Sequence, residues 1–305
     1  MTALPPPRHP ALTHVALVAA VTLWATIYVA AKSAMTVIPV AELIALRFTL
    51  GAGVLWAFIL VTGEKVEARA IGWRAFAVGL IEPGAASMLT FWGLKLTSAV
   101  SATVIFATIP VVTAAMSWVF LRERTASVVL VASGLALAGT ALLVADDASA
   151  LDTSLAGDLL ILGTLVFIVA VQLVQRRLAT HHGKPVVVTA WQLLGAAVAG
   201  YAVTPFAAPE AGAFAWVATA PPATWATLAY IGIMVSAVTF GIYNYALRYH
   251  PVARVNLYYT LVAPIGVPLA AVFLDEPISA LDIAAAVLVV IAVALPAVSE
   301  MWRKR

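Results

Sequence analysis

The sequence of 305 residues contains no cysteine, which excludes disulfide bonds and thiolate metal sites. Charged residues make up only 10% of it, whereas 63% of the residues are hydrophobic. A soluble protein of this size cannot hide so much apolar surface behind a charged exterior. No phosphate-binding loop, dinucleotide-binding turn or nucleophile elbow is present. The composition therefore predicts a polytopic membrane protein that is not an enzyme and has no metal or other cofactor.

Ten apolar runs follow a short polar N-terminal segment. Each is close to the ~20 residues that a helix needs to cross a bilayer. We expect the spans at residues 12–32, 37–62, 74–95, 98–120, 126–145, 155–176, 185–205, 223–246, 251–274 and 278–299. The connecting loops are short and none has the composition of a soluble domain. The sequence thus predicts an all-α integral membrane protein with ten transmembrane helices.

The distribution of basic residues predicts the orientation of these spans. If the N-terminus is cytoplasmic, all 17 Lys and Arg residues except Lys32, Lys95 and Arg47 lie on the cytoplasmic side. Cytoplasmic loops of membrane proteins carry such an excess of positive charge. We therefore expect a multi-pass protein of the inner membrane with both termini in the cytoplasm. The same distribution explains the basic pI of about 9.3 without a nucleic-acid partner.

One stretch of the sequence occurs twice. Residues 93–123 resemble residues 246–276 at an offset of 153, and the best matching pieces are Leu-Lys against Leu-Arg and Val-Phe-Leu against Val-Phe-Leu. The halves 1–150 and 151–305 then hold five spans each. Two repeats with an odd number of spans enter the membrane in opposite directions, an arrangement typical of transporters. We expect two inverted five-helix repeats.

Four stretches carry a resemblance to a known family. They are LWATIYVAAK at 23–32, AELIALRF at 41–48, FWGLKLTSAVSATVIFATIPVVTAAMSWVFLRER at 91–124 and YALRYHPVARVNLYYTLVAPIGVPLAAVFLDEP at 245–277. With these the chain resembles the ten-helix EamA-like branch of the drug/metabolite transporter superfamily. The resemblance implies a small-molecule transporter with a central cavity lined chiefly by helices 1, 3, 4, 6, 8 and 9. The second half departs from the pattern, because VVVTAWQLLGA has no counterpart to Arg47.

Glu82 lies near mid-depth in the third expected span. An ionised carboxylate at this depth costs ~2.5–3.5 kcal/mol and normally faces the bundle interior or a water-filled cavity. Three hypotheses are open. Glu82 couples protons or anchors a cationic group of the substrate, it forms a fixed structural pair with Arg47 on the neighbouring span, or it snorkels at the lipid edge. Arg47 could instead bind a substrate carboxylate through its bidentate fork.

The remaining candidates are aromatic and polar residues within the spans. Trp24 and Tyr28 are four apart and share a helix face, where aromatic rings suit ammonium groups or serve packing. Matching positions of spans 4 and 9 hold a polar residue and an aromatic, which line the path or join helices. The candidate substrate-binding residues are Trp24, Tyr28, Glu82, Thr103, Phe106, Gln172, Asn244, Asn256 and Tyr259.

Two prolines and one histidine complete the set of residues considered. Pro110 and Pro264 fall at almost equivalent places in spans 4 and 9 and are expected to bend these helices for gating. His250 follows span 8 and is expected to be solvated at the cytoplasmic interface rather than to bind a metal.

The sequence favours a secondary transporter that exports amino acids or related compounds by alternating access. We expect the two halves to rock about the central cavity, with a small molecule as substrate and the bilayer as surroundings. The alternative within transport is proton-coupled movement of an organic cation, in uptake or drug efflux. The alternative of another class is an intramembrane enzyme or a lipid scramblase. An enzyme would need a second catalytic group near Glu82, and a scramblase a polar stripe facing lipid.

Overall fold

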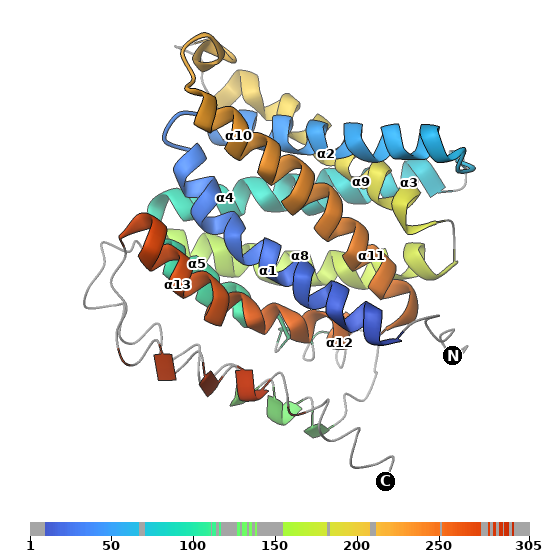
Figure 1. Cartoon of the computed structure of the whole chain (residues 1–305), viewed down its shortest axis with the longest axis vertical. Helices are drawn as coiled ribbons and strands as arrows, with labels where there is room; N and C mark the ends of the chain where they lie inside the picture. The colour runs from blue at the N-terminus through green and yellow to red at the C-terminus, as the bar shows by residue number, and fades with distance from the viewer. Residues whose placement is uncertain are drawn as a thin grey trace. The chain divides into compact units, whose positions relative to one another are not determined.

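The computed structural model describes residues 10–66, 71–110, 155–181, 184–207, 212–250 and 252–275, with scattered residues between 112 and 138 and between 280 and 295. All regular elements in this part of the chain are helical (Figure 1). They are α1 Pro10–Ala34, α2 Val40–Thr62, α3 Trp73–Gly79, η2 Leu80–Ala85, α4 Ala86–Leu96, α5 Ala99–Ala107, α8 Leu155–His181, α9 Pro185–Ala207, η3 Ala215–Ala218, α10 Pro222–Tyr230, η4 Ile231–Val238, α11 Thr239–Tyr249, α12 Val252–Leu257, η5 Tyr258–Leu261 and α13 Val262–Leu274.

Among the described residues, seven helical segments are long and apolar enough to cross a membrane. They coincide with the spans expected from the first, second, third, sixth, seventh, eighth and ninth apolar runs. The expected span at 98–120 is described mainly over α5. The expected spans at 126–145 and 278–299 lie largely outside the described residues. The protein is thus an all-helical, multi-pass membrane protein, and the count of ten spans stays a prediction.

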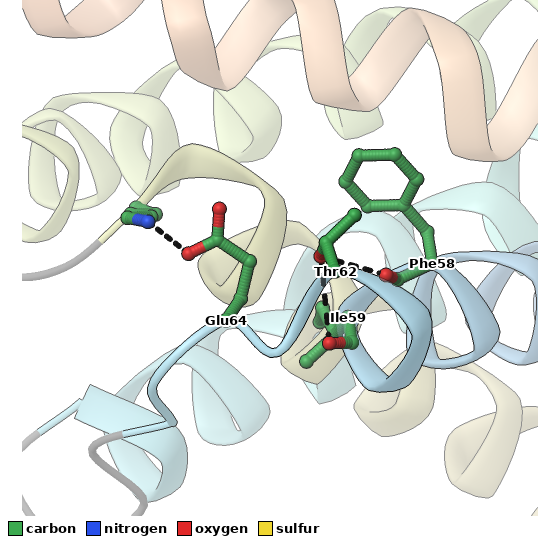
Figure 2. A network of polar contacts seen from close by, with 5 residues as sticks. Phe58, Ile59, Thr62 and Glu64 are labelled. Carbon is green, nitrogen blue, oxygen red and sulfur yellow. Dashed lines mark hydrogen bonds and ion pairs between the residues drawn. The ribbon is translucent and has the colours of Figure 1, made fainter.

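The end of α2 shows how local sequence terminates a helix. Gly63 adopts a left-handed conformation at φ 66°, which glycine reaches without steric cost, and its N–H bonds to the carbonyl of Ile59. The Thr62 hydroxyl donates to the carbonyl of Phe58 at 2.8 Å (Figure 2). Beyond the turn, the Glu64 carboxylate pairs with Lys184, which directly precedes α9. An exposed pair of this kind contributes only ~0–1 kcal/mol, so it positions the loops rather than stabilising the fold.

Three of the long spans are interrupted by a segment that departs from α-helical geometry. The π-helical segment η2 breaks the third span, where Pro83 has no N–H to donate. The π-helical segment η4 breaks the span from Pro222 to Tyr249, and there Ser236 donates to the carbonyl of Ile231, five residues earlier. A 3-10 segment, η5, breaks the span that ends in α13.

These interruptions recur at the repeat offset. Shifting η2 by 153 residues places it on 233–238, within η4. The same shift takes 105–108 to 258–261, the residues of η5. The helix α5 ends within residues 105–108. There the Thr108 backbone N–H donates to the Ile105 carbonyl, three residues earlier, as in a 3-10 turn. The two halves of the chain therefore break their helices at equivalent places.

The chain forms two compact units, each built from both halves of the sequence. Unit 1 comprises residues 1–16, 30–92 and 171–250. Its centre is the pair α2 and α9, with α3 and η2 packed on α9, and η4 packed on α2. Both α2 and α9 have 23 residues, so aligning them places Arg47 opposite Gln192 in the repeat.

Close glycine contacts in unit 1 follow this alignment. Gly79 of α3 lies against the backbone of Gln192, and a Cβ atom at Gly79 would overlap it. Gly232 of η4, which is 153 residues further on, lies against the carbonyl oxygen of Arg47, 2.9 Å from where its Cβ would be. The same close helix contact thus occurs twice, once on each helix of the central pair.

Unit 2 comprises residues 17–29, 93–170 and 251–305. In it, α5 packs on α13 and η5. A Cβ at Gly266 would lie 2.7 Å from the Cγ2 atom of Thr103, and Asn256 Nδ2 donates to Thr113 Oγ1 at 2.8 Å. A shift of 153 residues takes Thr103 to Asn256 and Thr113 to Gly266. The contact of Thr103 with Gly266 and that of Asn256 with Thr113 therefore join equivalent positions, with the two halves exchanged. Both units draw on residues 1–150 and 151–305, and the inverted repeat of these halves stays a prediction.

Candidate functional site

Glu82 lies where the third span departs from helical geometry. Its φ and ψ are −134° and 116°, inside an otherwise helical segment, and only 6% of its surface is exposed. The peptide bond to Pro83 is cis. Arg47 is the cation whose charge acts on the Glu82 carboxylate, and the charge of Glu82 acts in turn on Tyr243. Unit 1 therefore brings a guanidinium from α2, a carboxyl group from η2 and a phenol from α11 into electrostatic interaction.

The Arg47 side chain is buried and faces aromatic rings. Its Cζ atom lies 4.1 Å from the centroid of the Phe48 ring and 5.0 Å from that of Phe91. Its Nη2 atom donates to Ser87 Oγ at 3.4 Å. A cation over an aromatic face gains ~2 kcal/mol when both are desolvated. The rings therefore stabilise the guanidinium without neutralising it, and Glu82 is the acidic residue with which it interacts electrostatically.

The equivalent place in the second half is a neutral amide network. Asn244 Nδ2 donates to Gln192 Oε1 at 2.7 Å and to Thr189 Oγ1 at 2.9 Å, and all three residues are buried. Asn244 is the repeat equivalent of Phe91, as Gln192 is of Arg47. Sequence reasoning found no counterpart to Arg47, because the helices of the central pair align at an offset of 145 residues rather than 153.

Unit 2 gathers the aromatic candidates into two ring pairs. Trp24 stacks on Tyr259, with centroids 4.6 Å apart and planes at 25°. One helical turn along α1, Tyr28 packs against Phe106 at 5.4 Å with the planes tilted by 41°. Trp24 is half-buried and the other three rings are buried. The structure thus brings together four residues that the sequence singled out on three different spans.

The polar candidates of unit 2 make helix contacts. The Thr103 hydroxyl donates to the Ala99 carbonyl of its own helix at 2.6 Å, and Asn256 bonds to Thr113. The Asn256 bond joins segments far apart in the sequence, whereas the Thr103 bond stays within α5. Pro110 is buried, two residues beyond Thr108, the C-cap of α5. Pro264 lies in the first turn of α13, directly after η5.

The candidate residues divide between the units. Those of unit 1 are Glu82, Gln172 and Asn244; those of unit 2 are Trp24, Tyr28, Thr103, Phe106, Asn256 and Tyr259. Gln172 is buried on α8. Among the described residues, no group of three or more potential metal ligands from His, Asp and Glu occurs.

The expectation for His250 is wrong. The side chain is 7% exposed rather than solvated, and its ring lies 5.7 Å from that of His14 on α1. Burial follows from its place in unit 1, where the backbone of His250 caps α11 through a bond to the Ala246 carbonyl.

Sequence reasoning also missed the partners of Glu42. This carboxylate is 1% exposed and accepts hydrogen bonds from Trp216 Nε1 at 2.5 Å and from the Phe214 backbone N–H at 3.1 Å. Phe214 has a positive φ of 61°, so the loop before η3 turns sharply to reach the carboxylate. An acidic residue within an apolar run was the available signal, but the sequence gives no indication of a partner some 170 residues away.

Long spans broken at matching places around buried charges are typical of membrane transporters for small molecules. Comparison with known proteins identifies the class: residues 11–145 and 155–297 both match the EamA-like transporter family. The chain belongs to this family and is a multi-pass membrane transporter of small molecules. A known crystal structure aligns with 97% of this chain and 100% of its own at 20% identity, with a TM-score of 0.76, which shows that the two share a fold. No curated protein matches the chain.

Proposed function

We propose that the protein exports amino acids or related small metabolites across the inner membrane by alternating access. The observation that carries the proposal is the recurrence of helix interruptions at η2 and η4, which are equivalent places in the two halves. In secondary transporters, broken helices at matching positions of a repeat form the substrate site near the middle of the bilayer. Glu82 lies in one of these interruptions and supplies a group that recognises an ammonium ion.

The charges in unit 1 favour an amino acid over an organic cation. Glu82 alone would suit a cation, but Arg47 acts on the same carboxylate and repels a second positive charge. A substrate with both an ammonium and a carboxylate group has a complementary partner for each. Proton-coupled transport of an organic cation is therefore the second candidate. The match to transporters over both halves argues against an intramembrane enzyme or a scramblase.

Alternating access in this protein would use the interruptions as hinges. Rocking one whole half against the other would separate Gly79 from Gln192 and Asn256 from Thr113, contacts that lie inside the compact units. Changes at η2, η4 and η5 would leave these contacts in place. We therefore propose local rearrangement at the broken helices, in place of the rigid rocking of halves that the sequence alone suggested. The excess of basic residues on one side supports cytoplasmic termini.

The test compares metabolites exported by cells with and without the protein, followed by flux of the strongest hit in proteoliposomes. We expect one or more amino acids to accumulate outside the expressing cells and to move into liposomes only when the protein is present. The matched control is the double variant Glu64→Gln, Lys184→Gln, which removes only an exposed ion pair and is expected to transport normally. Transport of an organic cation with no amino acid flux would replace the first candidate by the second.

A further inference from the structure

We propose that Arg47 and Glu82 together bind the two charges of a zwitterion, with Arg47 on its carboxylate and Glu82 on its ammonium group. This inference rests on the proposed function and assigns its substrate selectivity to these two residues. The rival explanation is that the pair only holds helices together. Unit 1 contains the equivalent positions of both halves, so the residues at these positions can be compared to distinguish the two roles.

The second half carries no charge at the equivalent positions. Gln192 stands where Arg47 stands, and Val235, which is 1% exposed, stands where Glu82 stands at the repeat offset. Gly79 packs on the backbone of Gln192 as Gly232 packs on that of Arg47. Because Gln192 and Val235 are buried without charge at the equivalent positions, burial there does not require the two charged groups.

The energetics point the same way. Two charges removed from water lose more hydration than their attraction commonly returns, and apolar replacements of a buried pair are often neutral or stabilising. Ionisable groups at membrane depth are therefore a sign of function, with their partner as part of the site. Retention of charge in one copy alone, at Arg47 and Glu82, indicates that these charges serve a ligand.

The chemistry of the two groups defines that ligand. The Arg47 guanidinium lies over the Phe48 and Phe91 rings, and its planar fork matches a carboxylate in a bidentate manner. Glu82 lies at the non-helical residue of η2, where the backbone can adjust to admit an ammonium group. A zwitterion offers a carboxylate to Arg47 and an ammonium group to Glu82, so each group gains a partner of opposite charge. A simple amine or a simple acid leaves Arg47 or Glu82 uncompensated, so both should bind poorly.

The experiment replaces Arg47 and Glu82 by the residue types that the second half has at the equivalent positions, Gln and Val. The full-length double variant Arg47→Gln, Glu82→Val is reconstituted in liposomes beside the wild-type protein and the Glu64→Gln, Lys184→Gln control. The probes are L-leucine, 3-methylbutylamine, which lacks the carboxylate, and 4-methylpentanoate, which lacks the amino group. We expect wild type and control to transport leucine and to be inhibited about tenfold more weakly by the other two compounds, since each forfeits one charged hydrogen bond.

The double variant is expected to elute as a single species, to melt no lower than wild type, and to lose leucine flux by about tenfold or more. Leucine flux within twofold of wild type overturns the inference and leaves the proposed function intact. A misfolded double variant also overturns it, because the fold would then need the pair. Wild-type protein that transports neither leucine nor any other amino acid overturns the proposed function, and this inference with it.

Discussion

The glycine contact between α3 and α9 makes a quantitative prediction. In Gly79→Ala, the new methyl group would meet the backbone of Gln192, which cannot rotate away as a side chain can. In Gly53→Ala, on the neighbouring helix α2 of the same unit, the methyl group would meet nothing within 4 Å. The two substitutions are chemically identical and both replace a helical glycine, so they form a matched pair.

The expected energies have opposite signs. Alanine in a helix interior is about 1 kcal/mol more favourable than glycine, so Gly53→Ala should be about 1 kcal/mol more stable than wild type. Overpacking costs ~1–3 kcal/mol, and the backbone contact at Gly79 places this variant at the upper end of the range. A cost of about 3 kcal/mol for overpacking, offset by the gain of about 1 kcal/mol in helix propensity, leaves Gly79→Ala about 2 kcal/mol less stable than wild type. The two variants should therefore differ by about 3 kcal/mol in their free energies of unfolding.

The assay is equilibrium unfolding of the purified protein in mixed micelles, with the free energy of unfolding compared among wild type and the two variants. Transport should follow the same order, because moving α3 away from α9 also displaces Glu82 three residues further on. Equal stability of Gly79→Ala and Gly53→Ala would refute the reasoning, since α3 could not then press on the backbone of α9. The equivalence of the Gly79 and Gly232 contacts would fail with it.

Three further predictions concern gating, helix contacts and topology. Replacing both Pro110 and Pro264 by Ala restores backbone donors and should lower the turnover rate more than the substrate affinity; unchanged flux would make these prolines structural kinks only. Asn256→Leu removes the donor to Thr113 and should lower the free energy of unfolding by ~0.6 kcal/mol, and at most by ~1.7 kcal/mol, in the same micelle assay; no change would mean that the bond contributes nothing. Reporters fused after residues 68 and 305 should be active in the cytoplasm, and one fused after residue 150 outside it. A cytoplasmic reporter at 150 would contradict the topology of ten spans.

Hydropathy predicted the spans well, because the length of an apolar run is set by bilayer thickness. The interruptions were only partly predictable. Pro83 signals the break at η2, but η4 contains no proline and breaks where Ser236 bonds to a carbonyl five residues away. The electrostatic interaction between Arg47 and Glu82 was one of the sequence hypotheses, since they are the two charges near mid-depth. The place of Gln192 could be seen only once the packing of α9 was known.

The contact between Gly79 and Gln192 also affects how the protein is made. These residues are separated by more than a hundred positions, and a ribosome adds ~5–20 residues per second, so α9 is synthesised about 6–23 s after α3. During that interval the glycine face of α3 has already been synthesised while the helix that fills it has not. Lipid and the insertion machinery must cover this face in the nascent chain until the second half arrives. A longer delay applies to the junction of α5 with α13, so neither unit can close before most of the chain has entered the membrane.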